Sequence, residues 1–221
     1  MVAHGAAASL PQHGLRLWLS QQAKANHIWL VGGTIPCQQG IRDINKVRSA
    51  CFVYDSEGDE VARYDKIHMF DVDIEDSHGS YRESDTFEAG DQLVVIDTPV
   101  GKVGLTICYD LRFAEMHAKL VDLGAQIIVN GAAFTRTTGQ AHWHTLLRAR
   151  AIETQCYMLA ASHGGQHDHR QTFGHSMIID PWGEILVELD EGPGIAVACI
   201  DLDHLKTIRR AFPLQYQRRL K

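Results

Sequence analysis

Short runs of mostly apolar residues recur along this 221-residue chain and require a fold with buried strands. They lie at 28–31, 51–54, 61–64, 93–96, 103–108, 126–130, 157–161, 176–180, 185–189 and 195–200. Several are almost continuously apolar, as in strands covered on both faces. Helical spacing marks 15–22, 113–123 and 143–152, and turn residues at 56–59 and 181–183 predict hairpins. Alternating strands and helices indicate an α/β fold with helices layered over each sheet.

Composition excludes several classes of protein. The length suits one large domain over 1–221, and the net charge of -6 argues against a nucleic-acid partner. No apolar stretch has the length of a membrane span. The five cysteines are odd in number and include no CxxC pair, so a disulfide framework or structural zinc site is not expected. We therefore expect a protein of the reducing cytoplasm.

The most informative segment joins the strand at 103–108 to the helix that follows it. It reads Val-Gly-Leu-Thr-Ile-Cys-Tyr-Asp-Leu-Arg-Phe, so Cys108 stands where the strand ends. A sharp strand-to-helix turn exposes such a thiol and points backbone N–H groups, including that of Tyr109, into the same space. The nearby helix N-terminus favours the thiolate. Cys108 is therefore the candidate nucleophile.

Charged residues crowd around this cysteine. Asp110, Arg112 and Glu115 follow it closely, and charges at a buried strand end need partners. We expect an Arg112–Glu115 ion pair that braces the turn. Taken alone, a strand cysteine is more often a buried structural residue, which is our interpretation of Cys51, Cys156 and Cys199.

A lysine and a glutamate form a second set of candidates. Lys66 follows a predicted strand, and a lysine near a thiolate stabilises negative charge and lowers the thiol pKa. Local sequence alone favours a surface lysine. Glu83 lies in a polar loop, where a glutamate is normally solvated. Its functional interpretation is to position Lys66 or substrate.

Other polar residues allow weaker hypotheses. Arg136 offers forked donors to a substrate carboxylate, although a surface arginine is the favoured interpretation. The histidines suggest a papain-type Cys–His pair, but no papain-like motif surrounds Cys108. A metal site is the remaining alternative, built from His163, His167 and His169, or from His142 and His144. Neither group has a cysteine or carboxylate at a convincing spacing, so we expect no metal there.

Four blocks together resemble the nitrilase superfamily of carbon–nitrogen hydrolases. They are Lys66-Ile-His-Met-Phe-Asp, Tyr81-Arg-Glu-Ser, Gly104 to Glu115 with its Cys-Tyr-Asp-x-Arg-Phe core, and Gly174 to Gly183. The resemblance runs from about Trp29 to the C-terminus. Within the superfamily, 143–157 and 174–194 look most like the deaminated glutathione amidases, followed by the ω-amidases.

The resemblance implies a fold, a reaction and partners. The fold is a four-layer αββα sandwich whose helices pair across a homodimer, and the reaction is hydrolysis of a small-molecule amide without cofactor or metal. Cys108 matches the nucleophile, Lys66 the lysine that stabilises the tetrahedral intermediate, and Glu83 a supporting glutamate. The Tyr109 N–H shares the oxyanion with Lys66. Ala114 stands where the family usually has proline.

The beginning of the chain departs from the family pattern. The family's general-base glutamate lies on an early strand, before the segment that starts at Trp29, whereas the first glutamate here is Glu57 in a predicted turn. Nothing in 1–28 matches the first strand–helix–strand unit. We therefore expect an N-terminally incomplete domain that lacks this unit. Such a chain is either weakly active or a homologue with a binding or regulatory role.

This departure predicts low activity for the 221-residue polypeptide. General-base catalysis contributes roughly 10²–10⁴-fold in rate. We expect amide hydrolysis of deaminated glutathione to be slower by a factor in this range than in a version extended by a base-bearing strand. The measurement is release of the amine product by both purified proteins, and equal rates would contradict the prediction.

Overall fold

The computed structural model describes residues 12–75, 79–167 and 170–219. The chain forms two compact units, Met1–Val94 and Val95–Lys221, and each is described by itself. The first unit combines one α-helix with strands, and strands and helices alternate in the second, so the predicted α/β class is confirmed.

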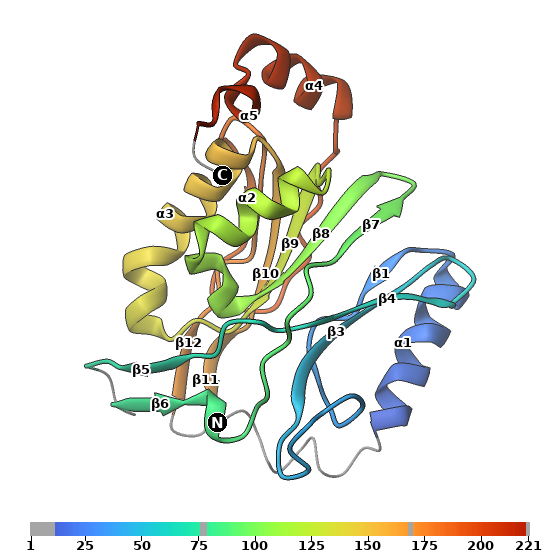
Figure 1. Ribbon diagram of the computed structural model, residues 1–221, viewed down its shortest axis with the longest axis vertical. Helices are drawn as coiled ribbons and strands as arrows, with labels where there is room; N and C mark the ends of the chain where they lie inside the picture. Colours follow the sequence, from blue (N-terminus) through green and yellow to red (C-terminus); the bar gives the residue numbers. More distant parts are fainter. Residues whose placement is uncertain (1–11, 76–78, 168–169, 220–221) are drawn as a thin grey trace. The chain divides into compact units, whose positions relative to one another are not determined.

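The first unit is built on an antiparallel sheet covered by a helix. Strand β3 is central and pairs with β1 and β2 along one edge and with β4 along the other. The bounds are α1 Gln12–Asn26, β1 Leu30–Val31, β2 Ile35–Cys37, β3 Arg48–Tyr54 and β4 Glu60–Asp65. Helix α1 lies along this sheet (Figure 1). Its buried Leu19 and Ala23 pack with apolar side chains of β2 and β3, which gives the unit its core.

A polar hairpin completes the first unit. It consists of β5 Asp71–Asp73 and β6 Ser80–Arg82, followed by the 3-10 turn η1 Glu83–Asp85. The sequence predicted a loop around Glu83, whereas the structure gives it a short helical turn. The predicted turn at 56–59 joins β3 to β4 and is confirmed, and there Asp55 accepts backbone N–H bonds from Glu57 and Asp59.

The second unit contains a six-stranded mixed sheet in the order β14-β13-β10-β9-β8-β7. The central strands β8, β9 and β10 run parallel, and the outer strands pair antiparallel. The bounds are β7 Val95–Thr98, β8 Gly101–Ile107, β9 Ile127–Ala132, β10 Tyr157–Ser162, β13 Met177–Ile179 and β14 Ile185–Glu188. The parallel strands therefore end together at one edge of the sheet.

Helices cover this sheet and close one end of it (Figure 1). They are α2 Ala114–Asp122, α3 Arg136–Thr154, α4 Leu202–Ala211 and α5 Leu214–Gln217. Helix α2 packs its buried Leu120 over Gly104 of β8, and α3 contacts both α2 and β10. A small ribbon, β11 Gly164–His167 with β12 Arg170–Phe173, lies beside α3. Trp143 and Leu147 of α3 are fully buried in the core.

The predicted elements are present except at 195–200, whereas several elements were not predicted. These are the short strands β2, β5, β6, β11 and β12 and the helices α4 and α5. The run at 195–200 forms no assigned strand, because its backbone pairs with none of the described strands; Ile195 and Val197 are 88% and 79% exposed. Helix α4 was not predicted because only Leu205 and Ile208 are buried along it. Its signal was the Asp201 cap, whose carboxylate accepts the N–H groups of Asp203 and His204.

Candidate active site

Cys108 follows the last residue of β8 directly, at the carboxyl edge of the parallel strands. Its backbone has φ 48°, a left-handed conformation that residues other than glycine rarely adopt, and its side chain is partly exposed. Such a conformation costs of order 1–3 kcal/mol and persists only where the surroundings enforce it. The predicted sharp turn is therefore present, with the thiol at the position where open α/β sheets bind ligands.

Buried hydrogen bonds hold this turn, the 3-10 segment η2 Cys108–Arg112. The carboxylate of Asp110 is fully buried and accepts the N–H of Ile107 at 2.9 Å, while the Asp110 carbonyl accepts the N–H of Phe113 at 3.0 Å. From α3, the Arg150 guanidinium donates to the Leu111 carbonyl at 2.9 Å. The turn is thus fixed from both sides of Cys108.

Arg112 does not form the expected pair with Glu115. Phe113, between them, has extended backbone angles, so Arg112 lies outside the helix that carries Glu115, and Glu115 is exposed. The Arg112 guanidinium instead contacts Nδ1 of His142 at 3.2 Å and lies 5.1 Å from the centre of the Phe134 ring. Burial lowers its pKa, and the nearby Tyr109 and Cys108 oppose that shift. Arg112 therefore provides positive charge close to the thiol.

Lys66 and Glu83 form a buried ion pair in the first unit. The Lys66 side chain is 3% exposed, and its ammonium donates a short hydrogen bond to Oε2 of Glu83. The same oxygen accepts the N–H of Phe70 at 2.6 Å. The lysine backbone is fixed too, because its N–H donates to Ser49 and its carbonyl accepts from Gly90. The surface-lysine interpretation is wrong, because the Lys66 side chain is buried and bonded to Glu83.

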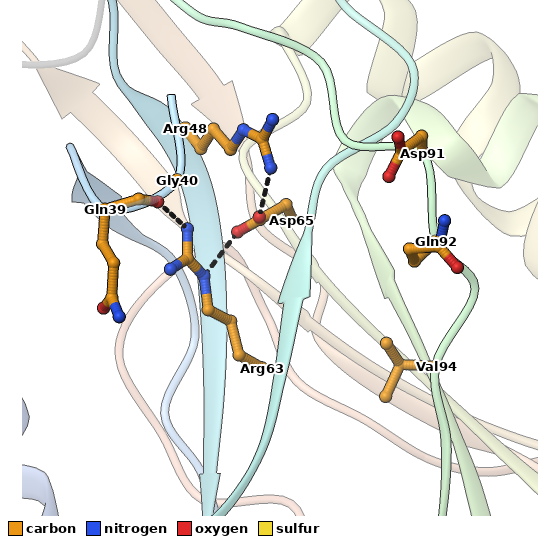
Figure 2. A pocket seen from close by; sticks show the side chains of 8 residues that line it. All are labelled: Gln39, Gly40, Arg48, Arg63, Asp65, Asp91, Gln92 and Val94. Carbon is orange, nitrogen blue, oxygen red and sulfur yellow. Dashed lines mark hydrogen bonds and ion pairs between the residues drawn. The ribbon is translucent and has the colours of Figure 1, made fainter. Parts of the chain in front are cut away.

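A hollow beside β4, the strand that ends just before Lys66, contains a different set of charged residues. Figure 2 shows Asp65 between two arginines; Arg48 bonds it at 3.0 Å and Arg63 at 2.7 Å. The hollow, of about 220 Å³, is lined by these three residues and by Gln39, Gly40, Asp91, Gln92 and Val94. Arg48 also holds Glu88 at 2.6 Å and lowers the pKa of that carboxyl to about 2. These charges compensate one another, so we assign the hollow a bracing role for β4.

The other sequence candidates are accounted for by their neighbours. Arg136 is half-exposed and pairs with Glu191 at 3.0 Å, in agreement with a surface arginine. The rings of His163 and His167 stack at 4.1 Å, and His169 lies outside the described residues. Burial raises the pKa of Cys51 to about 12 and also raises that of Cys156, as expected of structural cysteines. Cys199 is exposed, so its predicted burial is wrong.

Comparison with known families decides what this site belongs to. The family model described as carbon-nitrogen hydrolase matches residues 6–210. The chain is a member of the carbon–nitrogen hydrolase family. This match covers the Lys66–Glu83 pair of the first unit and the turn at Cys108 of the second unit. Within the described part of the chain, no helix is both long and apolar enough to cross a membrane.

Named relatives are similar over most of this chain. It is 46% identical over 200 residues to the deaminated glutathione amidase of Yersinia enterocolitica and 43% identical over 203 residues to that of Bos taurus. Each match covers 90% of this chain, and 70% and 62% of the relative. Omega-amidases are similar at 40% identity. This carbon–nitrogen hydrolase therefore spans between three-fifths and three-quarters of the length of these relatives.

Solved structures show the same fold. The C. elegans NitFhit protein matches with a TM-score of 0.85 and 38% identity, covering 92% of this chain and 50% of that one. Saccharomyces cerevisiae Nit3, a member of branch 10 of the nitrilase superfamily, matches with a TM-score of 0.81 and 34% identity, covering 93% of this chain and 72% of that one. The predicted nitrilase-like fold class is confirmed.

The buried pair predicts a large effect of Glu83→Gln. The substitution keeps an acceptor for the Phe70 N–H but leaves the Lys66 charge without a counter-charge. Breaking a buried pair in this way costs about 3–5 kcal/mol, and we expect the free energy of unfolding in urea to fall by that amount.

The matched control is Asp73→Asn, which breaks the exposed pair between Asp73 and Arg82. We expect a much smaller change there, because water screens that pair. Adding Lys66→Met to Glu83→Gln should recover part of the lost stability. Equal losses in Glu83→Gln and Asp73→Asn would contradict the prediction.

Proposed function

We propose that this chain hydrolyses the amide bond of a small carboxylic-acid amide through a thioester on Cys108. The observation that carries the proposal is the left-handed Cys108 at the end of a buried parallel strand, held by the Asp110 carboxylate. Membership of the carbon–nitrogen hydrolase family supports the bond type. The names of the Yersinia and Bos taurus relatives support deaminated glutathione as the substrate.

The proposed reaction has two displacement steps. The family's base glutamate has no match in residues 1–28, so the thiol proton passes to water, and the Cys108 sulfur attacks the amide carbon. When the tetrahedral intermediate collapses, its C–N bond breaks and ammonia or an amine leaves with the proton. Water then attacks the thioester, the C–S bond breaks, and the thiol and the carboxylic acid are released. No cofactor or metal enters either step.

The remaining site residues stabilise the negative charge that develops during the reaction or support the residues that do so. Lys66 and the Tyr109 N–H stabilise the oxyanion of the intermediate, and Glu83 holds the Lys66 ammonium in one position. Arg112 adds positive charge near the sulfur, because Cys108 is among the groups that oppose the lowering of the Arg112 pKa. Glu115 supports the start of α2, where a carboxylate near a helix N-terminus is favourable.

Two alternatives compete with this proposal. The similar omega-amidases favour an α-keto acid amide as substrate. A homologue with a binding role would keep the fold and the pair but not an activated thiol. Comparing rates on the two substrates distinguishes the first alternative from the proposal. The reactivity of the Cys108 thiol distinguishes the second.

Acrylamide labelling tests whether Cys108 is activated. Acrylamide combines an amide with an alkene to which a thiolate adds. We expect Cys108 to be labelled at least about tenfold faster than the exposed Cys199, because the turn holds its partly exposed sulfur in one place beside the Arg112 guanidinium. Cys51 and Cys156 should stay unlabelled at pH 7.5, since burial raises the pKa of both thiols.

The measurement is peptide mass spectrometry over a time course. Labelling of Cys199 before Cys108 would overturn the nucleophile assignment and favour the binding role. Release of the amine product from deaminated glutathione and of ammonia from an α-keto acid amide then ranks the substrates. Cys108→Ala should abolish release from both, whereas Cys199→Ala should leave it unchanged.

We further propose that residues 1–221 form a single hydrolase domain in a reducing compartment such as the cytoplasm, and that this domain is a homodimer. The family match across 6–210 supports one domain, and the five unpaired cysteines support the compartment. An apolar patch in the second unit, formed by Ile152, Trp182 and Phe212, supports the dimer. The three side chains are 44%, 64% and 51% exposed, and the rings of Trp182 and Phe212 lie 6.5 Å apart.

Trp182→Lys should disrupt this dimer. A charge at the centre of the apolar patch opposes its burial, so we expect a shift from dimer to monomer in size-exclusion chromatography with light scattering. Ile195→Lys is the control, because Ile195 is more exposed than Trp182 and lies outside the patch. The same mass for the wild-type and Trp182→Lys proteins would contradict the proposal.

A further inference from the structure

A cluster of two histidines and a glutamate lies in the second unit. It includes none of the residues assigned to catalysis. His144 comes from α3, His175 from the segment before β13, and Glu188 from the end of β14. Nε2 of His144 lies 2.7 Å and Nδ1 of His175 2.9 Å from the same carboxylate oxygen, Oε1 of Glu188. All three potential ligand atoms lie within 4.8 Å of one another.

The structure assigns a binding site for a divalent transition-metal ion of the zinc type to His144, His175 and Glu188. Two imidazole nitrogens and one carboxylate oxygen are a ligand set that Zn²⁺ uses in proteins, with water in the fourth position. The three side chains are 36%, 29% and 30% exposed, which leaves room for that water. Neither of the histidine groups considered from sequence contained this set.

The distances within the cluster suit a zinc ion after a small adjustment. Ligands about 2.0–2.1 Å from a tetrahedral zinc lie about 3.3 Å from one another, so each histidine nitrogen must move roughly half an ångström away from Oε1 of Glu188. In the hydrogen-bonded cluster the nitrogens that face Oε1 of Glu188 carry protons. On binding, the ion takes the place of the proton on each of these nitrogens, and each neutral imidazole carries its one proton on the other ring nitrogen. Neutral histidine and ionised carboxylate are then the ligating forms.

The residues behind the cluster fix its histidines. Trp143, next to His144, is fully buried and donates its indole N–H to the His175 carbonyl at 2.8 Å. His175 itself has φ 55°, a strained conformation that this bond helps to hold. The Phe173 ring lies 4.3 Å from the His175 ring and 6.0 Å from that of His144. Because these contacts already hold the two imidazoles in place, less conformational entropy is lost when an ion binds.

A bound ion would tie α3 to the β13–β14 hairpin. Trp182 lies in the turn of that hairpin, and Ile152 lies on α3. The same helix carries Arg150, which holds the turn at Cys108. The ion therefore has a structural role, and its binding stabilises the folded state by mass action.

Zinc binding to the 221-residue chain tests this assignment. We would use Cys108→Ala as the background, so that the active thiol is removed as a ligand, and measure Zn²⁺ affinity by competition with a chromophoric chelator. We expect one ion per chain, and Glu188→Gln should weaken binding by roughly tenfold or more. His163→Ala combined with His167→Ala is the matched control and should leave the affinity unchanged.

Thermal unfolding supplies the second readout. Zn²⁺ should raise the melting temperature of the background protein and of the His163/His167 control, but not that of Glu188→Gln. Circular dichroism checks that Glu188→Gln is folded; if it is not, His144→Gln takes its place. The same affinity with and without Glu188, or loss of binding in the His163/His167 control, would overturn the assignment and leave the cluster as a proton-sharing hydrogen-bond network.

Discussion

The left-handed backbone at Cys108 depends on one buried carboxylate. Asp110 is fully removed from water and accepts the N–H of Ile107, which is the last residue of β8. This bond joins the end of the strand to the turn that follows and compensates for an unfavourable φ angle. The position of the thiol at the edge of the sheet, and the charges that collect around it, follow from that one arrangement.

Helix α3 extends this constraint through the second unit. Its residues Arg150 and His142 contact the region of Cys108, one through the Leu111 carbonyl and the other through Arg112. Its buried Trp143 bonds to the segment that leads into β13. Segments that are far apart in the sequence are therefore held by the same helix. A rigid element of this kind keeps a reacting group within the small tolerances that catalysis requires.

The ion pair of Lys66 and Glu83 is a different kind of constraint. A buried pair costs more to desolvate than an exposed one and is weak evidence for stability. The Lys66 side chain is nevertheless only 3% exposed. A need for a positive charge in a fixed position explains this burial better than a gain in stability does. The Glu83 carboxylate also accepts the Phe70 N–H, so its own position does not depend on the lysine alone. The pair is thus suited to hold charge in a defined place.

The sequence by itself determined the class of fold and the candidate catalytic residues. Apolar runs predicted every strand of the two larger sheets except β2, and the block around Cys108 predicted a thiol at a strand end, because strand periodicity and turn chemistry are local properties. The tertiary structure decided the partners. It buried Lys66, separated Arg112 from Glu115, exposed Cys199 and brought His144, His175 and Glu188 together. These outcomes depend on packing between residues distant in the chain, about which local sequence carries no information.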